Sequence, residues 1–167
     1  LHLNSMSKNS INKNKILNPN LESTLVSISW RMNEVCKLLD ILYDVNCGGC
    51  CYIAYCLSKL LSKDGIDYDV IVISDDCYEL KNCETLNDIP CSCSHYGISI
   101  GGHLINIDNK DLEYEYVKYF NNVHPDNIKE HYKSEDWNNC YNTDKNDFIW
   151  ETLKTFYYDI TQNLREC

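Results

Sequence analysis

The clearest structural signal in this chain is the stretch HYGISI-GG-HLINID, which spans residues 95–108. Two six-residue runs rich in isoleucine flank Gly101 and Gly102, and a two-residue glycine loop is typical of a β-hairpin. If these glycines form the loop, Ile100 faces His103 and each step outward pairs the next two residues. The same register then places His95 opposite Asp108.

Alternation of side chains gives this hairpin two different faces. Directly opposed residues have Cβ atoms about 4.5–5.5 Å apart, so the Asp108 carboxylate can accept a ring N–H of His95. Such a bond fixes the histidine tautomer and leaves its second nitrogen as a base, although the pair is equally compatible with exposed cross-strand neighbours. The apolar face is expected to hold Tyr96, Ile98, Ile100, Ile105 and Ile107, and the other face His95, Gly97, Ser99, Asn106 and Asp108.

Helical periodicity appears on both sides of the motif NCGGC at 46–50. Apolar residues recur every three or four positions over 22–44, and a second, buried helix is expected from Cys50 to Lys63, ending at Gly65. The β-branched run 68–74 predicts a buried strand, 75–94 a long loop and 146–163 a closing helix, while 111–120 fits either strand or helix. We therefore expect an α+β fold, with the second helix packed on a small antiparallel sheet and flanking helices at each end.

The first twenty residues differ in composition from the rest of the chain. They are rich in Asn, Lys and Ser and hold too few apolar residues to offset the entropy of ordering. We predict a mobile tail over 1–20 and one domain over 21–167, a length that suits one domain better than two.

Charge, apolar runs and cysteine content narrow the classes of partner and the cellular compartment that we expect. The chain has 25 acidic and 15 basic residues and a formal charge of -10, which argues against nucleic acid as a partner. The longest apolar runs are far shorter than the roughly 20 residues that cross a bilayer, so no membrane association is expected. Eleven cysteines cannot all pair within the chain, and Cys36 and Cys56 lie in helical apolar contexts, which favours a reducing, cytoplasmic compartment.

Cys50 is the leading candidate for a nucleophile. It follows Gly48 and Gly49 directly, and it shares a helical stripe with Ala54 and Leu57, so its thiol is expected to point inward at the helix start. The N–H groups and dipole at that end favour a thiolate and can stabilise an oxyanion. The ordinary alternative is that Cys50 is one more buried small hydrophobe.

The run from Cys50 through Ala54 to Gly65-Ile66 resembles the transglutaminase-like branch of the papain-like cysteine hydrolases. There a nucleophilic Cys opens a helix, an Ala follows four residues later, and the helix closes at Gly-Ile before a strand. The string CGGCCYIA is also similar to the papain-type CGSCWAF, and the hairpin resembles that of the NlpC/P60 cell-wall peptidases. The family order Cys, His, Asp is matched by Cys50, His95 and Asp108.

The resemblance implies a papain-like core and acyl transfer through a thioester, with His95 taking the proton of Cys50 and Asp108 orienting His95. The implied substrate is a peptide, amide or isopeptide, including proteins, and no cofactor is required. Water as acceptor makes the chain a cysteine peptidase or amidohydrolase, and an amine makes it a transglutaminase-like transferase. Where papain-type enzymes carry an oxyanion-hole Gln this chain has Asp44, so Asn46 is the nearest candidate donor.

There are two alternatives to an enzyme, and the first gives the same cysteines a different role. Cys47 and Cys50 have the CxxC spacing of zinc ligands, and with Cys91 and Cys93 they supply four thiolates for a structural zinc, forming an interaction domain. A papain-like scaffold without activity, serving as a binding module, is the other alternative, because a fold does not fix a function.

Overall fold

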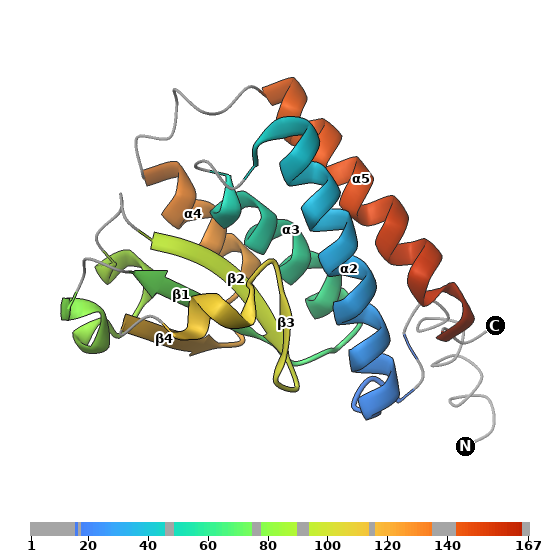
Figure 1. Ribbon diagram of the computed structural model, residues 1–167, viewed down its shortest axis with the longest axis horizontal. Coiled ribbons are helices and arrows are strands. Elements are labelled where there is room, and N and C mark those ends of the chain that lie inside the picture. Colours follow the sequence, from blue (N-terminus) through green and yellow to red (C-terminus); the bar gives the residue numbers. More distant parts are fainter. Residues whose placement is uncertain are drawn as a thin grey trace, which may run out of the picture.

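The computed structural model describes residues 16, 18–45, 49–74, 78–89, 94–113, 116–134 and 143–164. These residues form an α+β architecture, as predicted, in which helices pack against a four-stranded antiparallel sheet of order β3-β2-β1-β4 (Figure 1). None of the described helices is long and apolar enough to cross a membrane. The elements are α2 Glu22–Tyr43, α3 Cys50–Lys63, β1 Asp69–Ser74, β2 Ser94–Ile100, β3 His103–Ile105, β4 Tyr116–Asn121, α4 Pro125–Ser134 and α5 Thr143–Thr161.

The two helices expected around NCGGC form with nearly the predicted limits. The stripe of α2 buries Ile28, Met32 and Leu39 completely or almost completely. Helix α3 begins at Cys50 and ends at Lys63, after which Gly65 adopts φ +71, a conformation that glycine enters without the steric cost of a side chain. Helix α3 packs on β2, α4 and α5, and α2 runs beside α5 (Figure 1).

The sheet separates two apolar clusters of unequal size. The main core lies between the helices and the face that carries Tyr96, Ile98 and Ile100 of β2. The smaller cluster on the opposite face consists of Ile71, Ile73 and Ile107, with Leu104, Leu112 and Val117 packed against it.

The hairpin keeps the predicted register only as far as Ile105. Ile100 pairs with His103 and Ile98 with Ile105, as a glycine loop at 101–102 requires. Asn106 then adopts φ +61, a left-handed conformation that asparagine tolerates better than most residues, and the strand ends. This turn reverses the alternation, so the prediction that Ile107 lies on the main apolar face is wrong. Ile107 instead lies on the opposite face, over Gly97.

Three other predictions need correction or refinement. Most of the predicted N-terminal tail lies outside the described residues, and of the described ones Ile16 is buried in the main core. The predicted loop 75–94 contains 3₁₀ helices at Tyr78–Asn82 and Leu86–Asp88, which are too short to produce a periodic pattern. The ambiguous segment 111–120 contains the end of a 3₁₀ helix, Asn109–Glu113, and most of β4.

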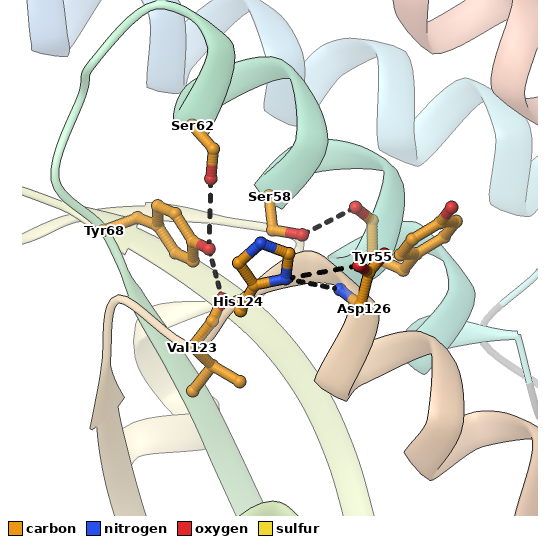
Figure 2. A network of polar contacts seen from close by, with 7 residues as sticks. All are labelled: Tyr55, Ser58, Ser62, Tyr68, Val123, His124 and Asp126. Carbon is orange, nitrogen blue, oxygen red and sulfur yellow. Dashed lines mark hydrogen bonds and ion pairs between the residues drawn. The ribbon is translucent and has the colours of Figure 1, made fainter.

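Polar contacts fasten the C-terminal half of α3 to the connection between β4 and α4 (Figure 2). The hydroxyl of Ser62 donates to that of Tyr68 at 3.3 Å, and Tyr68 in turn donates to the carbonyl of Val123. His124 follows directly, and its Nδ1 accepts the backbone N–H of Asp126 at 3.1 Å in the first turn of α4. This end of α3 is therefore held in place by hydrogen bonds as well as by packing.

Candidate active site

Cys50 and His95 lie together where the start of α3 meets the start of β2. Cys50 is the first residue of α3 and only 2% exposed, whereas His95 is the second residue of β2 and half-buried. The thiol and the imidazole ring are hydrogen-bonded to each other. The structure thus places a thiol and a base in direct contact, although 45 residues separate them in the sequence.

The end of the β2–β3 ladder explains how His95 meets a helix that packs on the isoleucine face. Strand β3 pairs only with residues 98–100 of β2, whereas β1 pairs with β2 from Ser94 onward. Among the residues that the structure describes, no strand pairs with β2 on its β3 side around His95, and the ring at this edge contacts both Cys50 and the residue that follows β3.

That residue is Asn106, whose backbone carbonyl lies 2.7 Å from Nε2 of His95. A carbonyl oxygen only accepts hydrogen bonds, so Nε2 carries the proton and donates it. The neutral ring therefore has Nδ1 as its acceptor, and Nδ1 is the nitrogen left to face the thiol of Cys50. This is the arrangement that a thiol needs in a partner that will remove its proton.

Asp108 does not form the predicted pair with His95. The ladder ends before it reaches these residues, because the left-handed turn at Asn106 carries the chain away from β2. Asp108 is exposed, and its backbone N–H donates to the carboxylate of Asp111 at 2.9 Å. Asn106 thus supplies through its backbone the hydrogen bond that we expected from the side chain of Asp108.

Several groups act on the charge of His95. Burial lowers the pKa of the ring, but this effect is outweighed by the hydrogen bond and negative charge of Cys50, the carbonyl of Asn106 and the charge of Asp111. The net result is a pKa above the ordinary value for histidine. The surroundings of the ring therefore favour its protonated form more than water does.

A cavity of about 660 Å³ lies beside His95, between α2 and the hairpin with its following turn. Trp30 and Asn33 line it from α2, and Asn106, Asp108 and Asp111 line it from the other side. Trp30 is 68% exposed and so adds a large, accessible aromatic surface to the lining of the cavity. Among the described residues the lining includes His95, which contacts Cys50, but not Cys50 itself.

The remaining predicted site residues fall mostly outside the described part of the chain. These are Asn46, the candidate oxyanion donor, and three of the four candidate zinc ligands, Cys47, Cys91 and Cys93. Among the residues that are described, no group of three or more His, Cys, Asp or Glu side chains has the geometry to hold a metal ion. Cys51, beside the candidate nucleophile, is completely buried.

Sequence reasoning missed two of the groups that act on His95. The carbonyl of Asn106 leaves no mark in a sequence, because every residue has one, although asparagine enters the left-handed region more often than most residues. Asp111 stood in a segment whose secondary structure remained ambiguous, so its position could not be deduced.

Comparison of the chain with protein-family models, with curated proteins and with solved structures found no match in any of the three.

Proposed function

We propose that the chain is a thiol-dependent acyl-transfer enzyme, with Cys50 as nucleophile and His95 as general base and acid. The contact between Cys50 and a histidine whose tautomer is fixed by Asn106 is the observation that carries the proposal. The order of elements supports a papain-like core, since a helix that begins with the thiol packs on an antiparallel strand whose second residue is the histidine.

The proposed reaction has two steps, with a thioester between them. Nδ1 of His95 takes the proton of Cys50, the thiolate forms a bond to an amide carbonyl carbon, and the C–N bond breaks as His95 returns the proton to the leaving amine. An acceptor then attacks the thioester carbonyl, gives its proton to His95, and releases the Cys50 thiolate. Water as acceptor makes the enzyme a peptidase or amidohydrolase, and an amine makes it a transferase.

The position of Cys50 at the helix N-terminus supports both steps. Backbone N–H groups of the first turn point out of a helix at this end, and the helix dipole favours negative charge there. They are therefore placed to stabilise the oxyanion of the tetrahedral intermediate that each step passes through. The cavity beside His95, with the exposed ring of Trp30 in its lining, is the place where the substrate chain of a peptide or protein would bind.

Selective alkylation tests the nucleophile directly. At about pH 6 a thiol with a pKa near 8.5 is almost fully protonated and reacts slowly, so an activated cysteine stands out. We expect iodoacetamide to label Cys50 first when each cysteine is mapped by mass spectrometry over time. Cys36 and Cys56 are internal references, because burial raises the pKa of each thiol to about 12.

Two pairs of variants make this experiment specific. His95→Ala should remove the faster labelling of Cys50. His131→Gln changes a different histidine, which is bonded to Tyr96, and should leave Cys50 labelled faster than the other cysteines. Cys50→Ser should abolish a covalent adduct with amide substrates in intact-mass spectra, whereas Cys51→Ser should not. Equal labelling of Cys50 in the His95→Ala protein would refute the proposal. Protection of Cys50 that ends only when a chelator is added would favour the zinc alternative instead.

A further inference from the structure

The side chain of Asn33 joins α2 to the chain immediately after β3. Its Oδ1 accepts the backbone N–H of Asn106 at 2.7 Å, and its Nδ2 donates to the carbonyl of Leu104. One amide group on a helix thus bonds two backbone groups on either side of Ile105, more than 70 residues away in the sequence. A carboxamide can do this because it presents a donor and an acceptor side by side.

Asn33 forms these bonds at the end of β3, where the pairing with β2 stops. Asn106 follows the last paired residue of β3, and its φ of +61 is a conformation that costs energy unless the surroundings maintain it. The amide of Asn33 forms with the backbone of Leu104 and Asn106 the hydrogen bonds that a neighbouring strand would otherwise supply. The peptide group between Ile105 and Asn106 is therefore fixed relative to α2, and the Asn106 carbonyl belongs to the peptide group that follows it.

We infer that Asn33 is a positioning residue for His95, which acts by holding the Asn106 carbonyl against Nε2. The chain of contacts runs from Asn33 to the Asn106 N–H, through the backbone of that residue, and from its carbonyl to the ring. When this carbonyl is in place, the proton stays on Nε2 and Nδ1 stays available to the thiol. The catalytic consequence rests on the proposed function, but the effect on the ring does not.

Removal of the amide should release the turn at Asn106. The left-handed residue then relaxes, its carbonyl withdraws from the ring, and the two tautomers of His95 both become populated. A base in the wrong tautomer has its proton facing the thiol and cannot accept another there. Alkylation of Cys50 should therefore slow about 3- to 10-fold, the range expected for the loss of one positioning hydrogen bond.

Nitrogen NMR of the histidine rings measures the tautomer without any reference to catalysis. At a pH high enough to keep the ring neutral, we expect His95 to show the Nε2–H form in the unaltered protein and a substantial share of the Nδ1–H form in Asn33→Ala. Glu34→Ala is the matched control, because Glu34 is the next residue of α2, is exposed and does not line the cavity. Asn106→Gly should keep the Nε2–H form, since glycine adopts φ +61 readily and retains the carbonyl.

Asn33→Asp serves if Asn33→Ala does not fold. It keeps an acceptor for the Asn106 N–H and loses the donor to Leu104, so the Nε2–H form should decrease but remain the larger share. A ring spectrum identical to that of the unaltered protein in the folded Asn33 variant would overturn the inference. If the tautomer responds to Asn33 but Cys50 is not labelled preferentially in the unaltered protein, the positioning role stands and the proposed function fails.

Discussion

Gly97→Ala tests whether the turn at Asn106 places the side chain of Ile107 on the face of the sheet where residue 97 lies. A Cβ atom at residue 97 would lie 2.2 Å from Cγ1 and 2.4 Å from Cδ1 of Ile107, and 2.9 Å from the carbonyl oxygen of Ile105. Rotation of the Ile107 side chain relieves the first two clashes, but the third involves backbone and requires the hairpin to move. Overpacking of this kind costs about 1–3 kcal/mol, or a decrease of about 2–12 °C in Tm for a chain of this size.

Urea unfolding followed by circular dichroism gives the free energy directly, and Ile107→Ala supplies the control. In the Ile107→Ala background the cost of Gly97→Ala should decrease to what the Ile105 carbonyl alone imposes, a coupling that a double-mutant cycle measures. An unbroken alternation would place Ile107 on the opposite face and leave residue 97 uncrowded. A Gly97→Ala protein as stable as the unaltered one, within about 0.5 kcal/mol, would therefore refute the reversal at Asn106.

Three further changes test the core and the site. Tyr157→Phe removes a 2.7 Å hydrogen bond to the buried carboxylate of Asp64, and urea unfolding should show a loss of about 1–3 kcal/mol; an unchanged midpoint would contradict this. Burial lowers the pKa of His131, so its neutral form stabilises the fold above the unfolded-state pKa of about 6.5, and this contribution is lost as the pH falls through the lower folded-state value. His131→Gln should thus reduce the difference in unfolding free energy between about pH 7.5 and pH 5, and an undiminished difference would argue against it. Burial also opposes the charge of His95 while Cys50 favours it, so Cys50→Ala should lower the pKa of His95 in an NMR titration, and an unchanged value would mean that the two side chains do not interact.

Local patterns were sufficient to predict most of the elements but not the geometry at their ends. The three- and four-residue spacing over 22–44 and 50–63 predicted α2 and α3 because each buries a continuous stripe. Gly101 and Gly102 likewise predicted the loop and the register of the hairpin. These features depend only on neighbouring residues, which a single sequence displays.

The geometry of the candidate site depends on how the chain turns after β3, where the alternating pattern of a strand gives no information. The run HLINID alternates as a strand does, and nothing in that alternation indicates that Asn106 turns into the left-handed region. Once it does, Ile107 changes face and Asp108 moves away from His95. Cys50 and His95 could be proposed as a pair from the sequence because a thiol and an imidazole are conspicuous side chains, whereas a backbone carbonyl that bonds the ring is not.

The contact between Asn33 and Leu104 also has a consequence for the behaviour of the molecule at high concentration. An edge strand presents unpaired backbone groups that can recruit the edge of a second molecule, and such pairing leads to aggregation. Strand β3 is an edge of the sheet, but it is three residues long, and the carbonyl of Leu104 is already bonded to α2. The hydrogen bonds that hold the end of the hairpin thereby also deprive a second chain of a surface on which to extend the sheet.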